Sequence, residues 1–202
     1  MKNTRTKTDT TAKATVADGR HLRSKRSRAK IVDALFDVIR AGDMNPSAAQ
    51  LAAKANVGIR TVFRHFDDVD GLYREMAAQM EAEILPVLTE PYTSTDWQGQ
   101  LFELIDRRAE IYETILPVKV AANLRRFQSE YLMQDYERSL TIERACLTAI
   151  LPESVLADST LLATLEMLTG FNTWCSLRQD QGLSAGQSRD VIAETTRKLI
   201  GA

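Results

Sequence analysis

Apolar residues recur every three or four positions through most of this 202-residue sequence, and this period constrains the fold more than any other feature. We expect the first helix to begin near Arg28. In this segment Ile31, Leu35 and Val38 fall on one side of a helix. The alternation that is typical of a half-buried strand is scarce, and aromatic residues make up only 6% of the chain. The sequence therefore predicts an all-α protein and not a β-sandwich or barrel.

The composition is that of a globular protein that can bury a core, with 44% hydrophobic and 26% charged residues. A run of about 18 apolar residues, which a membrane-spanning helix requires, does not occur. The N-terminal segment is charged and rich in Thr, unlike a secretory signal. Cys146 and Cys175 form neither a metal-ligand motif nor a disulfide framework. We therefore expect a cytoplasmic protein without a membrane partner.

Positive charge is concentrated at the N-terminus. Residues 1–30 contain ten basic and two acidic residues, a net charge of +8, so the other 172 residues carry −9 of the total −1. This asymmetry favours a polyanionic partner, nucleic acid more readily than a membrane, although a solvated tail has the same composition. Residues 1–24 have no apolar period and are predicted to be a disordered arm. The candidate DNA-binding residues of the arm are Arg20, Arg23, Lys25, Arg26 and Arg28.

A second, short helix is predicted to follow Ser47. Ser47 and Gln50 have the spacing of a capping box, in which each side chain bonds the other residue's backbone N–H. The helix should end at Asn56-Val57-Gly58, because Asn tolerates the left-handed conformation and Gly has no Cβ. The sequence thus predicts a tight turn directly after this helix.

The next segment, Ile59–Phe66, is predicted to be a third helix with Val62 on its inner side and polar residues elsewhere. Together with the preceding helix and turn it forms a candidate helix-turn-helix. A helix that lies in a DNA major groove must be polar and basic on its outer face. Arg60 and Arg64 are four residues apart and suit bidentate contact with guanine, although a solvated or salt-bridged pair has the same spacing.

The remainder of the chain is predicted to be helical almost to its end. We expect a helix over about 70–85, with Pro86 and Pro91 marking its exit, and a helix over 101–115 that ends at Pro117. Residues 120–151 are expected to form two helices or one kinked helix. A long helix is expected over 155–178. A last helix over 184–200 begins with a second capping box at Ser184 and Gln187.

The segment AAKANVGIRTVFRHFDDVDGLY, residues 52–73, resembles the TetR family of bacterial transcriptional regulators, and the resemblance covers about residues 28–80. Three positions differ from the family pattern: Gly58 replaces a Ser or Thr cap, Phe63 replaces a Tyr, and Val69 replaces a Lys that contacts phosphate. The resemblance and the helix pattern together predict DNA contacts from Ser47, Arg60, Thr61, Phe63, Arg64 and His65.

Residues 165–200 resemble the last two helices of the same family, which form a four-helix bundle across a dimer. The resemblance implies a homodimer, with Leu161, Leu165, Leu168, Trp174, Ile192 and Leu199 as candidate interface residues. It also implies a cavity for a small apolar or amphipathic ligand, with Trp97, Phe102, Tyr112, Phe127 and Tyr131 as candidate lining residues. Each of these aromatic residues is also compatible with a purely structural place in the core.

The sequence offers no support for an enzyme, because it has no Gly-rich phosphate loop, no cluster of metal ligands and only two His. We expect no metal and no cofactor. The expected organisation is an arm over 1–24, a DNA-binding domain over 25–80, and a helical ligand-binding and dimerisation domain over 81–202.

The predicted function is a dimeric regulator, a repressor that a ligand releases from a near-palindromic operator in double-stranded DNA. One alternative is a weakly specific architectural DNA-binding protein driven by the arm. Another is a protein-interaction module on the same fold.

Overall fold

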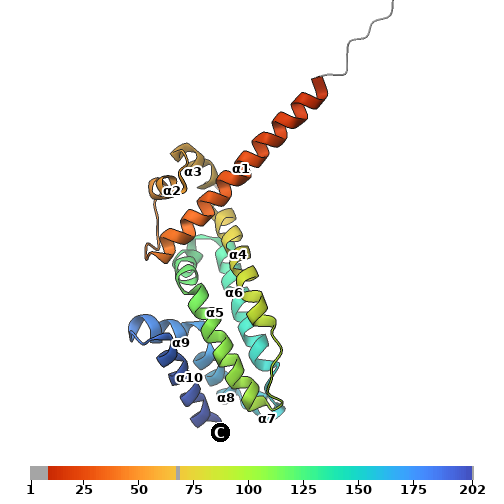
Figure 1. The fold of residues 1–202 in the computed structure, drawn as a ribbon. Coiled ribbons are helices and arrows are strands. Elements are labelled where there is room, and N and C mark those ends of the chain that lie inside the picture. The colour runs from red at the N-terminus through yellow and green to blue at the C-terminus, as the bar shows by residue number, and fades with distance from the viewer. Residues whose placement is uncertain (1–8, 67–68, 202) are drawn as a thin grey trace, which may run out of the picture. The chain divides into compact units, whose positions relative to one another are not determined.

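The computed structural model describes residues 9–66 and 69–201, and the chain is all-α over these residues (Figure 1). The chain divides into two compact units, Met1–Met76 and Ala77–Ala202, which are described separately below. Among the described residues, no helix combines the length and the apolar character that are needed to cross a membrane.

The N-terminal unit consists of α1 (Asp9–Arg40), α2 (Ala48–Ala55), α3 (Ile59–Phe66) and the beginning of α4 (Val69–Thr89). Figure 1 shows α2 and α3 packed beside α1. Every helix of the unit contributes side chains to the core, which is why α3 is stable although it has only eight residues. The fully buried core residues are Ile31, Val32, Ile39, Leu51, Val62, Leu72 and Met76.

The first helix differs from its prediction. α1 begins at Asp9 and not near Arg28, so the prediction of a disordered arm is wrong for residues 9–24, whereas residues 1–8 lie outside the described part. Periodicity gave no signal here because residues 9–27 have no apolar stripe. A helix needs no such stripe to extend beyond a packed segment, since each added residue gains one backbone hydrogen bond.

The turn between α2 and α3 forms as predicted. Ser47 caps α2 in a capping box with Gln50, and Asn56 has φ 51° and ψ 52°, in the left-handed region. The N–H of Val57 bonds the carbonyl of Ala52 at 3.0 Å, and the carbonyl of Gly58 accepts the N–H of Thr61 at 2.8 Å. These bonds satisfy both helix ends at the turn.

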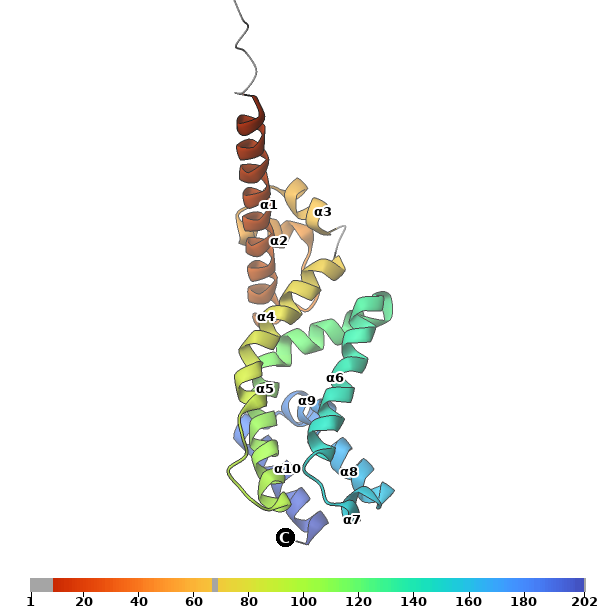
Figure 2. The ribbon, with the colours of Figure 1, turned by 90° about the vertical axis from the view of Figure 1, so that its right-hand side faces the viewer.

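The C-terminal unit contains the rest of α4 and eight further helical segments. These are α5 (Trp97–Arg125), η1 (Arg126–Gln128), α6 (Glu130–Thr148), α7 (Glu153–Leu156), α8 (Ser159–Thr169), α9 (Phe171–Cys175), the π-helical turn η2 (Ser176–Asp180) and α10 (Ala185–Ile200). The chain turns at η1, so α6 returns antiparallel beside α5, as Figure 2 shows. α10 packs against both α5 and α8.

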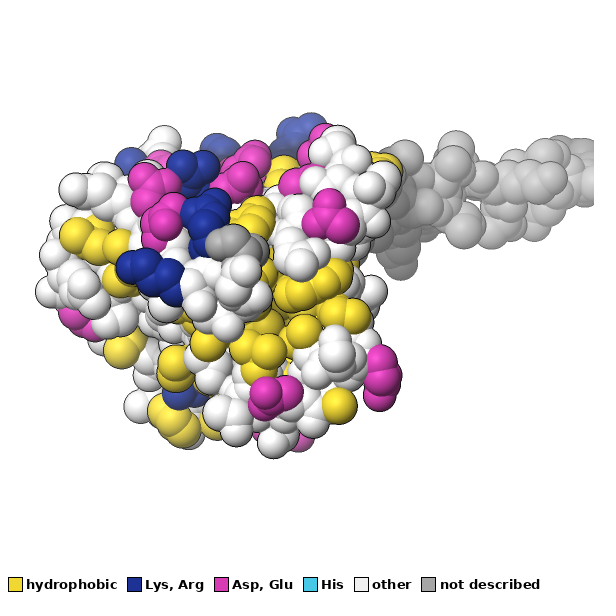
Figure 3. Space-filling view, turned by 90° about the horizontal axis from the view of Figure 1, so that it is seen from below, with side chains coloured by type: hydrophobic (Ala, Val, Ile, Leu, Met, Phe, Trp, Pro, Cys, Tyr) yellow, Lys and Arg dark blue, Asp and Glu magenta, His cyan; other side chains and the backbone are white. Residues whose placement is uncertain are grey.

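Two apolar clusters form the core of this unit. Cluster A comprises Ile105, Ile111, Tyr112, Leu168, Phe171, Trp174, Leu177 and Ile192. Cluster B comprises Leu101, Leu104, Leu147, Leu151, Val155 and Leu165. Hydrophobic side chains also gather on the surface at the lower end of the view in Figure 1. Figure 3 looks at this face from below and shows them in yellow across its middle.

Two predicted helix boundaries in this unit are wrong. Pro86 lies inside α4 and Pro117 inside α5, which continues to Arg125. The cost of a proline in α5 is offset by burial on both sides of it, where Tyr112 and Val118 pack into the core.

The helix predicted over 155–178 is divided into α7, α8, α9 and η2. Asp158 caps α8 by accepting the N–H groups of Thr160 and Leu161, and this ends α7. Gly170 has φ −82° and ψ 162°, an extended conformation that separates α8 from α9. A Cβ at this position would lie 2.9 Å from the carbonyl oxygen of Glu166. Local capping and a close backbone approach therefore interrupt a segment that is apolar throughout.

Candidate nucleic-acid interface

The exposed face of α3 is basic and partly apolar. Arg60 and Arg64 are exposed, and neither forms a hydrogen bond or an ion pair with any described residue. Ile59 and Phe63 are 46% and 53% exposed beside them, whereas Val62 on the opposite side is fully buried. α3 thus exposes two guanidinium groups, without a partner in the described part of the chain, on a helix that directly follows a tight turn.

Two other residues predicted to contact DNA, Thr61 and Ser47, are less available than the two arginines of α3. Thr61 is half-buried near the start of α3. The hydroxyl of Ser47 accepts the backbone N–H of Gln50 at 3.3 Å. The same hydroxyl donates to Oε1 of the Gln50 side chain at 2.7 Å. Ser47 therefore has a structural role as the cap of α2, and its side chain is exposed.

His65 is only 7% exposed, so the prediction that it contacts DNA is wrong for this conformation. Its Nε2 atom is enclosed and has no hydrogen-bond partner among the described residues. Burial lowers the pKa of His65, and the charges of Arg64 and Arg28 lower it further, while Glu75 opposes them. The position belongs to the inner side of α3 because it follows Val62 by three residues.

Arg28, predicted as a DNA-binding residue of the arm, instead forms an ion pair with Glu75. The pair joins α1 to α4 within the N-terminal unit, and the Arg28 side chain is 23% exposed. Arg28 thus has a structural contact in this conformation, because it lies on the side of α1 that also carries Ile31 and Leu35, and its contact with DNA stays a prediction.

Two other basic residues of α1, Lys25 and Arg26, are exposed. The side chains of Arg20 and Arg23 lie outside the described residues. Lys25 and Arg26 are therefore the predicted arm residues whose side chains are described and available to a polyanion.

The aromatic residues predicted to line a ligand cavity do not come together in one place. Trp97 packs against cluster B, whereas Tyr112 belongs to cluster A and Phe102 packs against that cluster. Phe127 is 75% exposed in η1, where the guanidinium of Arg126 stacks on its ring. Tyr131 is half-buried on α6. Periodicity showed that these residues lie on helices but not which helices pack together.

The predicted dimer residues are mostly buried within the single chain. Leu165, Leu168, Trp174 and Ile192 belong to clusters A and B, and Leu161 packs against cluster B. Side chains already buried in one chain cannot supply a subunit interface, so the prediction is wrong for these four cluster members. Leu199 is exposed.

Besides Leu199, the adjacent helices α8 and α10 expose two apolar residues that were not predicted, Met167 and Val191. Met167 is 65% exposed, and Val191 and Leu199 are also exposed. The helices were correctly singled out as apolar, but the sequence did not show which face of each helix the single chain covers.

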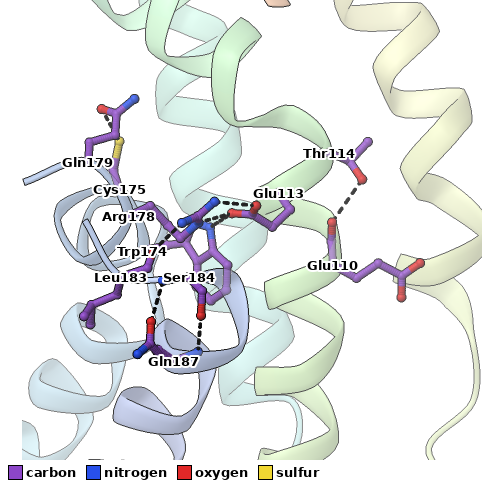
Figure 4. Close-up of polar contacts among 10 residues, drawn as sticks. All are labelled: Glu110, Glu113, Thr114, Trp174, Cys175, Arg178, Gln179, Leu183, Ser184 and Gln187. Carbon is purple, nitrogen blue, oxygen red and sulfur yellow. Dashed lines mark hydrogen bonds and ion pairs between the residues drawn. The ribbon is translucent and has the colours of Figure 1, made fainter. Parts of the chain in front are cut away.

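Sequence analysis also missed a polar clamp, which Figure 4 shows. The carboxylate of Glu113 on α5 accepts Nε1–H of Trp174 at 2.9 Å and two N–H groups of Arg178 at 2.7 and 3.1 Å. Arg178 also donates to the carbonyl of Leu183, just before the cap of α10 at Ser184. One carboxylate thus joins α5, α9 and η2, and Arg178 extends the contact to the start of α10.

A second missed group is charged and enclosed. Arg108 lies in the apolar register of α5, between Ile105 and Tyr112, and is buried. A charged residue at an apolar position of a helix is the sequence signal that could have revealed it.

The fold is similar to the crystal structure of a transcriptional regulator from Rhodococcus sp. Rha1, with a TM-score of 0.60 and 18% sequence identity. The alignment covers 87% of this chain and 96% of the Rhodococcus chain. No protein-family model matches the sequence, and no curated protein matches it either. At this identity the likeness establishes the fold, an all-α arrangement with a helix-turn-helix and a helical C-terminal unit.

Proposed function

We propose that the protein is a sequence-specific DNA-binding transcriptional regulator of the TetR type. One observation carries the proposal: the second helix of the helix-turn-helix exposes Arg60 and Arg64, which have no partner among the described residues. Exposed guanidinium groups that are not engaged by these residues keep their donors for a ligand. The shared fold with a transcriptional regulator supports the same conclusion.

In the proposed complex, α3 lies in the major groove. Arg60 and Arg64 read guanine O6 and N7, and each bidentate contact contributes about 1–3 kcal/mol of discrimination. Phe63 and Ile59, exposed on the same helix, contact thymine methyl groups or the sugar edge. Thr61 at the helix start is placed to contact a phosphate.

We propose a homodimer that binds a near-palindromic operator. The exposed Met167, Val191 and Leu199 on the adjacent helices α8 and α10 are the apolar side chains we assign to its interface. Two copies of α3 would then contact half-sites one helical turn apart, about 34–36 Å, or a multiple of this distance.

The basic residues Lys25 and Arg26 on α1 contribute non-specific attraction to phosphates in this proposal. Counterion release then makes the affinity fall steeply with salt. If this attraction dominated, the protein would be the weakly specific architectural DNA-binding protein considered above, and the experiment below separates the two.

We further propose that the regulator is a repressor and that a small ligand in the C-terminal unit releases it from DNA. A coupling free energy of about 1–3 kcal/mol between the two sites gives a 5- to 150-fold change in operator affinity. The clamp at Glu113 supports this, because it ties α5 to η2 and the start of α10, so a shift of α5 reaches a helix of the proposed interface.

The test is selection of genomic DNA fragments by the purified protein at near-physiological salt, followed by sequencing. The Arg60→Ala/Arg64→Ala variant is compared with a control, Arg144→Ala/Arg189→Ala, which removes two exposed arginines of the C-terminal unit. We expect one palindromic motif with the wild type and the control, and loss of that motif with the α3 variant. Motif-free recovery of DNA that the α3 variant retains would overturn sequence-specific regulation and favour the architectural function.

A further inference from the structure

Two large apolar side chains are exposed on α3, beside its two arginines. Ile59 is 46% exposed and Phe63 is 53% exposed, although α3 has only eight residues. In the described part of the N-terminal unit, one other large hydrophobic side chain is exposed, that of Leu22 on α1. A pair of exposed apolar side chains on one short helix indicates a contact surface, because exposed apolar surface is unfavourable in water.

The helical period arranges the outer side chains of α3 in two rows. Successive residues of a helix are about 100° apart around its axis, and residues four apart are separated by about 6 Å along it. Ile59 and Phe63 therefore form an apolar row, and Arg60 and Arg64 form a basic row about 100° further around the axis. The fully buried Val62 lies on the side opposite the basic row. Both rows thus belong to the outer surface of one helix.

The apolar row is suited to an apolar partner. Phe63 stands where the TetR pattern has a Tyr, whose hydroxyl could bond a phosphate, whereas the Phe ring has no polar atom. Ile59 likewise has only an aliphatic side chain. A partner that placed a donor, an acceptor or a charge against these side chains would lose hydration there without gaining a hydrogen bond.

The basic row restricts the choice of that partner. Arg60 and Arg64 are exposed, and neither forms a hydrogen bond or an ion pair with a described residue. Their charges favour an anionic partner that also presents apolar groups close by. The DNA major groove meets both conditions, because guanine presents O6 and N7 there and thymine presents its C5-methyl group. The groups that the other bases present there are hydrogen-bond donors and acceptors, so thymine alone offers an apolar contact.

The spacing of the side chains in each row predicts the spacing of the bases. Base pairs are stacked about 3.4 Å apart, so the separation of about 6 Å between Ile59 and Phe63 corresponds to about two base-pair steps. The same separation holds for Arg60 and Arg64. A half-site that matches α3 therefore contains two thymines about two base pairs apart, and guanines at a similar spacing.

We propose that Ile59 and Phe63 are specificity-determining residues, which select thymine in each operator half-site through its C5-methyl group. The inference rests on the proposed function and adds to it a second kind of base recognition, in which contact with methyl groups complements the guanine contacts of the arginines. It also explains why α3 exposes large apolar side chains at positions where polar side chains would be better solvated.

The test uses the full chain and the duplexes recovered in the selection described above. Each thymine of one half-site is replaced in turn by uracil, which keeps the base pair and removes only the methyl group. Binding is measured by fluorescence anisotropy. We expect uracil at two positions, about two base pairs apart, to weaken binding about fourfold each, the effect of losing the burial of one methyl group. Uracil outside the half-sites should have no effect.

Two variants assign the methyl contacts to their side chains. Ile59→Ala and Phe63→Ala should each abolish the preference for thymine over uracil at one of the two positions and retain it at the other. Leu22→Ala, which removes the exposed apolar side chain of α1, is the matched control and should retain both preferences. Thermal unfolding shows whether each variant remains folded.

A further substitution separates the methyl group from the rest of the thymine base. Cytosine and 5-methylcytosine replace thymine at each of the two positions, with guanine in the opposite strand. The wild type should bind the 5-methylcytosine duplex about fourfold more tightly than the cytosine duplex, because the methyl group occupies the same place in the groove. Equal affinity for the two duplexes would contradict recognition of the methyl group.

The remaining outcomes distinguish this inference from the function on which it rests. Equal binding of thymine and uracil duplexes by the wild type, or an unchanged preference in both folded alanine variants, would overturn the methyl contact. If Arg60→Ala/Arg64→Ala still removes the selected motif in that case, the proposed regulator remains supported. Motif-free recovery of DNA in the selection would overturn both.

Discussion

Asn56 shows how one residue sets the geometry of the candidate interface. Its left-handed backbone, with φ 51°, turns the chain from α2 into α3 and directs Arg60 and Arg64 outward. The left-handed conformation costs most L-residues about 1–2 kcal/mol, but Asn adopts it more readily. A short local signal therefore determines the position of two exposed side chains.

His65 makes the stability of the N-terminal unit depend on pH. Its pKa in the folded chain lies below its ordinary value of 6.5, so the fold favours the neutral form. The stabilisation is complete above the unfolded pKa and is lost as the pH falls below it towards the folded pKa. We expect the unfolding free energy of the unit to decrease as the pH falls below about 6.5.

This dependence is measured by thermal unfolding between pH 5 and pH 8 in a His21→Leu background, in which His65 is the remaining histidine. Adding His65→Leu should flatten the curve over this range, because it removes the histidine that takes up a proton on unfolding. The substitution loses no hydrogen bond of Nε2 to a described residue. An identical pH dependence with and without His65 would contradict the assignment.

At the scale of elements, the Glu113 clamp joins helices that are distant in the sequence. Glu113→Ala should lower the unfolding free energy by about 2 kcal/mol, because it leaves the buried indole N–H of Trp174 without an acceptor. Arg178→Met should cost less, about 1 kcal/mol, since the ion pair is partly exposed.

Urea unfolding measures both values. Glu110→Ala is the matched control, since in Figure 4 its carboxylate points away from the clamp and only its backbone carbonyl is bonded, by Thr114. This control should change stability by less than about 0.5 kcal/mol. A Glu113→Ala variant as stable as the control would show that the clamp contributes little.

At the scale of the whole molecule, the proposed dimer places Met167 and Val191 in an apolar interface. Replacing both by Glu introduces charges that are costly to bury but well solvated in the monomer. We expect Met167→Glu/Val191→Glu to be monomeric while it retains its helical content. Multi-angle light scattering after size-exclusion chromatography measures the mass.

Leu140→Glu, a change at an exposed apolar residue of α6, is the control and should remain dimeric. A dimer formed equally well by the α8/α10 variant would place the interface on another surface.

How much of the molecule the sequence predicted depended on the range of the interactions. The capping boxes at Ser47 and Ser184 and the left-handed Asn56 are present as predicted, because they involve atoms within three or four residues. The sequence did not correctly predict where the helices of the C-terminal unit are interrupted. Pro117 did not end α5, and Gly170 did end α8, because distant packing and a close backbone approach decided each case.

In the candidate DNA-binding face, too, local features could be predicted from the sequence and contacts between distant segments could not. Arg60 and Arg64 could be placed on the outer face of α3 from the helical period alone. Whether His65 and Arg28 face solvent could not be decided in this way, because their environment comes from other helices, among them α4 with Glu75.

The sequence by itself thus determined the all-α class, the helix-turn-helix and its caps, since these depend on periodicity and on local hydrogen bonds. Only the tertiary structure decided which apolar faces of α8 and α10 remain exposed, and that the guanidinium of Arg108 is enclosed. The physical reason is that burial is a property of the packed chain. A side chain becomes core, clamp or contact surface through the neighbours that distant segments bring to it.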